Sequence, residues 1–440
     1  MTLCYKFVFK ETATIAVFYV ENHGGMQCCV THLAGNFMSI KARFTEGVAL
    51  SDSCATGIKK ISSSSQSVLS MQDAEIAFAE ISQWPGYQPT PLRSLDVLCD
   101  HVGCAEVLYK DESTRFGLGS FKALGGAYAV LRLVAHQYRE QRGKAVSLAA
   151  IRQGELSEFT ASMTVTTATD GNHGRSVAWG ARNAGCNCRI YIHREVSDGR
   201  KEAMEALGAT VVRIDGDYDE SVRHCAAESS TNDWHVVSDT SYGDYVSVPR
   251  DVMAGYTVIA SEVLQQTDKP ITHLFVQAGV GGLAGAVAAR LWLELNDHRP
   301  TIILVESEYA DCWLQSFRRQ EPTAVSIERE TVMAGLSCGE VSVLAWDILS
   351  QCADHVITLP DRDVATAMKL FADGQMGGGS IEAGECAVPG ALALMCCGHD
   401  SELQKIVGIG SDSRVLLLGC EGATDPVVYR RLLESVTGSR

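Results

Sequence analysis

The chain has few prolines, a deficit of positive charge and no long apolar run. Its 440 residues include only 10 prolines against 40 glycines, and 37 basic against 53 acidic side chains give a formal charge of −16. No apolar stretch approaches the roughly 20 residues that cross a bilayer, and an acidic surface repels phosphate backbones. We therefore expect no membrane segment and no nucleic-acid partner.

The 16 cysteines contain no C-x-x-C pair. Two groups are adjacent pairs, Cys28-Cys29 and Cys396-Cys397, and the other cysteines are scattered. Structural zinc needs paired ligands on tight turns, and disulfide scaffolds concentrate cysteine in short secreted chains. Because neither pattern is present, we expect no metal ion, and reduced, buried thiols in a cytoplasmic protein.

Length and periodicity predict an α/β protein with two lobes. At roughly 150 residues per domain the chain allows two or three domains, and from residue 163 β-prone segments alternate with helical ones. That alternation is typical of parallel strands joined by right-handed crossovers. We expect helices at 74–82, 174–183, 197–207 and 218–228, and strands at 163–167, 188–192, 210–214 and 235–237. A second alternating run begins at 272, and small ligands commonly bind in clefts between lobes.

Residues 1–80 differ from the rest and form an N-terminal extension of unknown role. Two short stretches, 5–9 and 16–20, are rich in β-prone residues. The polar tract 61–67 resembles a flexible linker.

The first candidate site is the glycine cluster Q-A-G-V-G-G-L-A-G at 277–285, which follows an apolar strand and opens an alanine-rich helix. Bare N–H groups at a helix N-terminus bind anions such as phosphate. No Lys-Ser or Lys-Thr follows, so the loop is not a nucleotide-triphosphate loop. The run also fits G-x-G-x-x-A, and Glu306 closes the next strand where a ribose-binding acid would lie. A dinucleotide-binding protein is therefore an alternative, as is a tight turn without a ligand.

The second candidate is Lys122, in S-F-K-A-L-G-G-A-Y at 120–128. It opens an apolar, small-residue helix behind a glycine-bearing loop. Apolar walls and a helix N-terminus lower the proton affinity of a lysine, so we expect Lys122 to be a nucleophile able to form a Schiff base with an aldehyde cofactor. The alternative is an ordinary lysine on a surface helix.

The third candidate is T-D-G-N-H-G-R at 169–175, a polar turn between a predicted strand and helix. It offers hydroxyl, amide and N–H groups to a carboxylate or a ring oxygen. A simpler role for Asp170 is a helix cap, and for His173 a local hydrogen bond.

These three segments, with C-E-G-A-T-D at 420–425 and G-Y-Q-P-T-P-L at 86–92, resemble the fold type II pyridoxal-phosphate enzymes. Within that group they are most similar to the diaminopropionate ammonia-lyases, in order over about residues 82–430. The resemblance implies parallel-rich open sheets flanked by helices, with the active site in the cleft between two lobes. It implies a large cofactor-binding domain of residues 81–128 and 237–440, and a small α/β domain of residues 129–236.

The resemblance also implies which residues hold pyridoxal 5'-phosphate. Lys122 would carry it as a Schiff base, Asn172 would bond its ring oxygen, and Cys420 would lie near its pyridine nitrogen. A neutral partner for that nitrogen favours elimination over transamination. The phosphate would be cradled by Gly279, Val280, Gly281, Gly282 and Leu283.

The activity implied is α,β-elimination of ammonia from a small amino acid, L- or D-2,3-diaminopropionate, which yields pyruvate through an aminoacrylate. Lys122 would remove the Cα proton of one enantiomer and Asp170 that of the other, while Asp239 would bind the β-ammonium group. The substrate carboxylate would be held at the turn that contains Thr169, Asp170, Gly171 and His173. Family members are commonly homodimers, so we expect one here.

Four positions, Gly119, Ser120, Cys386 and Ala423, depart from the family pattern near the ring or the cleft mouth. They leave open another fold type II reaction, such as serine or threonine dehydration or a β-replacement. A non-catalytic relative is a further alternative, against which the joint presence of Lys122, Asp170 and Asp239 argues.

Overall fold

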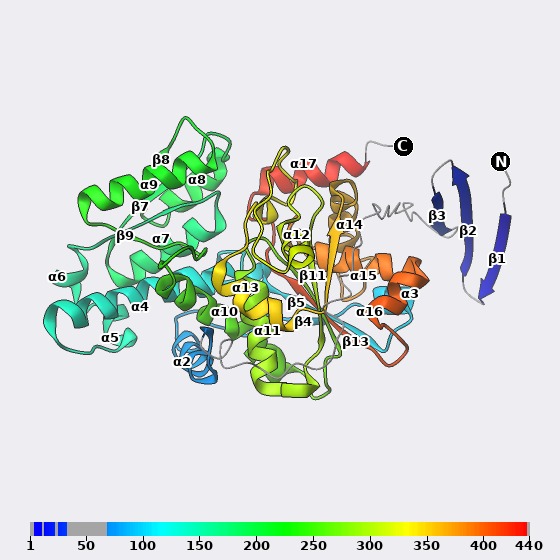
Figure 1. The fold of residues 1–440 in the computed structure, drawn as a ribbon, viewed down its shortest axis with the longest axis horizontal. Helices are drawn as coiled ribbons and strands as arrows, with labels where there is room; N and C mark the ends of the chain where they lie inside the picture. Colours follow the sequence, from blue (N-terminus) through cyan, green and yellow to red (C-terminus); the bar gives the residue numbers. More distant parts are fainter. Residues whose placement is uncertain (1–3, 11–12, 23–24, 33–67, 438–440) are drawn as a thin grey trace.

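The computed structural model describes residues 4–10, 13–22, 25–32 and 68–437 (Figure 1). The first three segments are the strands β1 (Cys4–Lys10), β2 (Ala13–Asn22) and β3 (Gly25–His32), which form an antiparallel sheet in that order. Cys4 lies opposite Tyr19, and Ile15 lies opposite His32. The β-prone stretches of the sequence fall within β1 and β2, whereas the predicted linker at 61–67 lies outside the described residues.

The larger sheet of the remaining chain has six strands in the order β12-β11-β10-β13-β5-β4. All neighbours are parallel except β4, which pairs antiparallel with β5 at the edge. The strands are β4 (Leu92–Ser94), β5 (Glu106–Asp111), β10 (His273–Gln277), β11 (Thr301–Ser307), β12 (His355–Leu359) and β13 (Arg414–Gly419). Every residue of β10 is buried, as expected of a parallel strand covered on both faces.

The smaller sheet has four parallel strands in the order β8-β7-β6-β9. They are β6 (Thr164–Ala168), β7 (Asn187–Ile192), β8 (Thr210–Arg213) and β9 (His235–Val236). The connecting helices are α7 (Asn172–Ala184), α8 (Asp198–Glu205) and α9 (Tyr218–Asn232). All four predicted strands and the three predicted helices of this region are confirmed.

Helices cover both sheets, and Figure 1 shows the smaller sheet with α7, α8 and α9 on one side of the molecule and the larger sheet with its helices on the other. The other α-helices before the second alternating run are α2 (Met71–Ile81), α3 (Asp96–Val102), α4 (Lys122–Arg142), α5 (Leu148–Arg152), α6 (Ser157–Thr160) and α10 (Ser247–Gln266). Those after it are α11 (Gly282–Leu295), α12 (Cys312–Arg319), α13 (Val343–Cys352), α14 (Val364–Ala372), α15 (Pro389–His399), α16 (Ser401–Val407) and α17 (Pro426–Thr437). Short 3₁₀ turns are η1 (Glu112–Gly117), η2 (Asn296–His298), η3 (Ala334–Leu336) and η4 (Asp361–Asp363). The α/β fold with parallel-rich sheets flanked by helices is confirmed.

Helix α4 packs between α7 and α10 because its first turns carry glycines. A Cβ at Gly125 would lie 2.4 Å from the Tyr256 ring of α10, and one at Gly126 would lie 2.5 Å from Oγ of Ser176 in α7. Oγ of Ser176 in turn accepts a 3.0 Å bond from the backbone N–H of Ala127. The lysine that opens α4 is thereby fixed against helices of both sheet units.

The predicted division into domains stays a prediction. The smaller sheet does lie within residues 129–236, but α4 is continuous across the boundary at 128. None of the helices in the described part of the chain is long and apolar enough to cross a membrane.

Candidate active site

Lys122 is the first residue of α4, and the loop before it is pinned to the end of β13. The backbone N–H of Phe121 donates to the carbonyl of Cys420 at 3.0 Å, and that of Gly422 donates to the carbonyl of Gly119 at 2.9 Å. The Lys122 side chain is 25% exposed, and its Nζ lies 2.6 Å from Oδ2 of Asp239. Two of the three predicted catalytic groups are therefore in direct contact.

The charge state of Lys122 differs from the expectation. Burial lowers its pKa, but the carboxylates of Asp239 and Asp170 outweigh burial and raise the pKa well above its ordinary value. The predicted loss of proton affinity is therefore wrong for this arrangement, because apolar walls decide the pKa only where no carboxylate faces the amine. Burial likewise raises the pKa of Asp239, but His173 and Lys122 bring it below its ordinary value.

The turn after β6 places its side chains around this ion pair. Oγ1 of Thr169 accepts the backbone N–H groups of Gly171 at 3.1 Å and Gly174 at 3.3 Å, so the hydroxyl closes the turn. Asp170 is half-buried, and its charge acts on Lys122. Nδ2 of Asn172 donates to Oε2 of Glu421 at 2.5 Å.

His173 is buried and belongs to the same turn. Its Nε2 lies 2.8 Å from the carbonyl of Val237, and its Nδ1 lies 3.7 Å from Oδ2 of Asp239 without a hydrogen bond. Burial lowers the pKa of His173, so the ring is neutral at pH 7 and Nε2 carries its proton toward Val237. The unpaired Nδ1 is the atom of this ring that remains for a ligand.

The glycine cluster joins β10 to the N-terminus of α11. Gly281 has a φ of 95° and no side chain caps the helix. A Cβ at Gly281 would lie 2.2 Å from the Trp313 ring, whose Nε1 donates to the carbonyl of Gly279 at 2.7 Å. An uncapped helix start with bare glycines is an anion site, and it fits the phosphate of pyridoxal phosphate.

Glu306 does not support the dinucleotide alternative. Its side chain is fully buried and accepts the backbone N–H groups of Trp313 at 2.9 Å and Leu314 at 2.8 Å, at the start of α12. Burial raises its pKa well above the ordinary value. The acid therefore caps a helix and is not available to a ribose.

Cys420 is buried beside a group of acids. Its Sγ donates to the carbonyl of Cys386 at 3.1 Å. Burial first, and the charge of Glu421 second, raise the pKa of Cys420 well above its ordinary value. The side chain is therefore a neutral thiol, as a neutral partner of the pyridine nitrogen would have to be.

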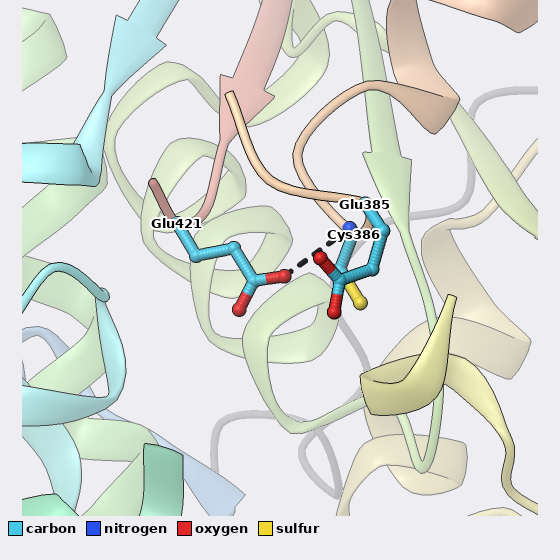
Figure 2. Close-up of side chains that lie close together, drawn as sticks. All are labelled: Glu385, Cys386 and Glu421. Carbon is cyan, nitrogen blue, oxygen red and sulfur yellow. Dashed lines mark hydrogen bonds between the residues drawn. The ribbon is translucent and has the colours of Figure 1, made fainter. Parts of the chain in front are cut away.

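Figure 2 shows Glu385 and Glu421 pointing toward each other beside Cys386. Ligand atoms of these three residues lie within 4.8 Å of one another, the spacing of a metal site. Oε1 of Glu421 already accepts the backbone N–H of Cys386 at 3.2 Å, and Oε2 accepts Asn172. Burial raises the pKa of the Cys386 thiol, which disfavours the thiolate that a metal would need. We assign no metal to this group.

The sequence reasoning missed Tyr218, at the start of α9. The carboxylates of Asp170 and Asp239 both raise the pKa of its hydroxyl, after burial as the first cause, and the charge of Lys122 lowers it. The ring is 45% exposed. No motif surrounds Tyr218, and only the packing of α9 brings its hydroxyl near the three predicted catalytic groups.

Comparison with known proteins shows the family of the chain. The family described as "pyridoxal-phosphate dependent enzyme" matches residues 83–412. The chain is 34% identical to the diaminopropionate ammonia-lyase of Escherichia coli (strain K12) over 373 residues, which cover 83% of this chain and 92% of that protein. The enzyme of the same name from Salmonella typhimurium (strain LT2) is 34% identical over 359 residues, covering 79% of this chain and 89% of that protein.

Solved structures agree with this comparison. The E. coli diaminopropionate ammonia lyase in complex with an aminoacrylate-PLP azomethine reaction intermediate matches with a TM-score of 0.76 at 32% identity, covering 86% of this chain and 95% of that chain. The holo form of the same lyase also gives a TM-score of 0.76 at 32% identity, covering 84% of this chain and 94% of that chain.

Proposed function

Because this chain belongs to the diaminopropionate ammonia-lyase family of pyridoxal-phosphate-dependent enzymes, we propose that it eliminates ammonia from 2,3-diaminopropionate. With one water the products are pyruvate and two molecules of ammonia. The observation that carries the proposal is the contact between Nζ of Lys122 and Asp239, with the Asp170 carboxylate acting on the same amine.

The cofactor site would be built from four segments. The N–H groups at the start of α11, with Gly279 to Leu283, would hold the phosphate, Asn172 the ring oxygen, and the neutral thiol of Cys420 the ring nitrogen. Lys122 would hold the aldehyde carbon. When bound, pyridoxal phosphate supplies the electron sink that makes the Cα proton of an amino acid acidic.

Asp239 would exchange partners when cofactor and substrate bind. Without them it pairs with Lys122 and keeps that amine protonated. A Lys122 that holds the cofactor aldehyde offers no ammonium group to Asp239, so the carboxylate would be free to bind the β-ammonium group of the substrate. Once the substrate amine has displaced Lys122 from the aldehyde, the lysine would act as a base, because its former partner is occupied. The same carboxylate would keep the leaving nitrogen protonated, so that it departs as ammonia. A serine hydroxyl carries no charge for Asp239 to bind and would not be kept protonated as a leaving group in this way.

Asp170 and Lys122 would remove the Cα proton from opposite faces of the substrate. We expect Asp170→Asn to lower kcat/KM for the D-isomer by about 100-fold or more, the usual contribution of a general base, and to spare the L-isomer. Ammonia release from each isomer measures this, and Asp219→Asn, at an exposed acid of α9, is the matched control. Equal loss on both isomers would remove Asp170 from the role of base.

Substrate choice is tested by ammonia release from diaminopropionate, serine and threonine. We expect diaminopropionate to be preferred, and Asp239→Asn to reduce that preference because it removes the charge that recognises the β-ammonium group. A wild-type preference for serine or threonine would instead support a dehydratase.

We also propose that the enzyme is a cytoplasmic homodimer. Family resemblance supports the dimer, and the twelve cysteines from Cys99 to Cys420 are free thiols, which suits a reducing compartment. Sedimentation equilibrium of the purified protein tests the dimer, and fractionation of cells that produce it tests the location.

A further inference from the structure

Arg200, in α8, connects the Asp170 turn to the larger sheet unit. Its Nη1 donates to the backbone carbonyl of Asp170 at 3.2 Å. Its Nη2 lies 3.3 Å from Oε1 of Glu385, and its Nε lies 3.8 Å from Oδ2 of Asp425. The side chain is only 17% exposed. One guanidinium thus contacts the turn that carries a proposed base and two acids that lie more than 180 residues further along the chain.

The acids that Arg200 contacts are themselves fixed. Oδ1 of Asp425 accepts the backbone N–H groups of Val427 and Val428 at 3.1 Å each, so this carboxylate caps α17. Its Oδ2 accepts Oγ of Ser197 at 2.6 Å, and that hydroxyl caps α8 by accepting the N–H of Arg200. Two side chains at the start of α8 therefore meet one immobilised carboxylate of the other unit.

The turn is shaped to receive Arg200. A Cβ at Gly171 would lie 3.2 Å from Cδ of Arg200, so the missing side chain leaves room for the arginine stem to cross the turn. The charges of Glu385, Asp170, Glu421 and Asp425 all act on the guanidinium. A planar guanidinium can donate in several directions at once, which the single ammonium of a lysine cannot do with the same geometry.

We propose that Arg200 is a positioning residue that holds the Asp170 turn against the larger sheet unit, so that the Asp170 carboxylate stays directed at the substrate. The inference rests on the proposed role of Asp170 as base for the D-isomer. Lys122 is held by separate contacts, at Cys420 and Asp239. Loss of Arg200 therefore affects proton removal from the two faces unequally.

The test compares Arg200→Met and Arg200→Lys with Arg213→Met. Arg213 also supports the start of α8, through the carbonyls of Arg194 and Val196 and the carboxylate of Asp198, but these partners all lie in the smaller unit. Two quantities are measured on the full-length holoenzyme: kcat/KM for each diaminopropionate isomer, and the hydrogen-exchange rate of the peptide that spans residues 169–175.

Arg200→Met is expected to lower kcat/KM for the D-isomer by roughly ten-fold to 100-fold, the cost of a displacement of about 1 Å, with little change for the L-isomer. It is also expected to speed exchange of the turn amides. Arg200→Lys is expected to restore neither kcat/KM for the D-isomer nor the slow exchange of the turn amides. Arg213→Met is expected to change kcat/KM equally for the two isomers and to leave exchange in the turn unaltered.

The two readouts separate this inference from the proposed function. Faster exchange in Arg200→Met with an unchanged isomer ratio would show that Arg200 anchors the turn but that Asp170 is not the base. Unchanged exchange, or equal loss on both isomers, overturns the inference whatever the Asp170→Asn variant shows.

Discussion

Two carboxylates near the site have pKa values shifted in opposite directions. The pKa of Asp239 is lowered, because His173 and Lys122 outweigh its burial. The pKa of Glu385 is raised from 4.5 to about 7, by burial first and by Glu421 second, and Arg200 offsets only part of that rise. Asp239 therefore stays charged at neutral pH, whereas Glu385 changes its charge near neutrality.

The raised pKa of Glu385 predicts that the free energy of unfolding depends on pH. Between pH 4.5 and about 7 the folded chain binds the Glu385 proton more tightly than the unfolded chain does. The free energy of unfolding therefore falls as the pH rises through that interval, by at most about 3.5 kcal/mol at roughly 1.4 kcal/mol per pKa unit. Urea unfolding of the wild type and of Glu385→Gln across the interval measures the difference.

In Glu385→Gln this contribution is absent, so the free energy of unfolding of the wild type should rise relative to that of the variant as the pH is lowered from about 7 to 4.5. Comparing the two proteins cancels the titration of the histidines. A difference that is constant with pH, or that grows as the pH rises, would contradict the raised pKa.

At the residue scale, local sequence predicts which residues are candidates for the site but not their charge states. Lys122 stands out because an apolar, glycine-containing helix follows it, and Gly279 to Leu283 stand out because glycines follow a buried strand. The ion pair that sets the charge of Lys122 joins residues 117 positions apart. Tyr218 was missed for the same reason, since its neighbours in sequence carry no signal.

At the scale of elements, periodicity predicted the helices and strands around the smaller sheet because each signal is local. The strand expected at 163–167 is Thr164–Ala168. The helix expected at 218–228 runs on to Asn232, because its last turn is polar and gives no apolar periodicity. Packing between the elements was not predictable, since it depends on the absence of side chains at particular glycines.

The contact between α4 and α7 should be sensitive to a single methyl group. A Cβ at Gly180 would lie 2.6 Å from Cα of Ala127, and backbone cannot move aside as a flexible side chain can. We expect Gly180→Ala to lower the free energy of unfolding by about 1–3 kcal/mol through overpacking. Chemical denaturation measures the change.

The matched control is Gly199→Ala in α8, where nothing lies within 4 Å of the added Cβ. There the higher helix propensity of alanine should raise stability by up to about 1 kcal/mol. A gain in stability in both variants would show that α4 and α7 are further apart than described.

At the scale of the whole molecule, strand order gathers segments that are far apart in sequence. In the larger sheet β10, β13 and β5 are neighbours. The glycine cluster follows β10, Cys420 follows β13, and the loop that leads to Lys122 follows β5. Because parallel strands end at one edge of a sheet, these three segments meet there. All three segments could be identified from the sequence. That they are adjacent depends on the strand order, which hydrophobic periodicity does not determine.

That convergence predicts how the cofactor should stabilise the protein. A ligand that binds only the folded state at about 100 times its Kd adds about 2.7 kcal/mol to the free energy of unfolding. Pyridoxal phosphate should therefore raise the thermal midpoint of cofactor-free protein. Borohydride reduction of the loaded protein should leave the cofactor's mass on the peptide that contains Lys122, whereas a dinucleotide-binding protein would leave that lysine free.

Pyridoxal, which has the aldehyde but no phosphate, separates the two ends of the site. It keeps the contacts at Lys122 but loses those at the uncapped start of α11, where an anion is stabilised by free N–H groups and the helix dipole. Pyridoxal should therefore need a much higher concentration than pyridoxal phosphate for the same rise in thermal midpoint. Inorganic phosphate should compete with pyridoxal phosphate but not with pyridoxal. If pyridoxal stabilised the protein equally at equal concentration, the glycine cluster would not be the phosphate site, and its glycines would serve only the close packing of Trp313 against Gly281.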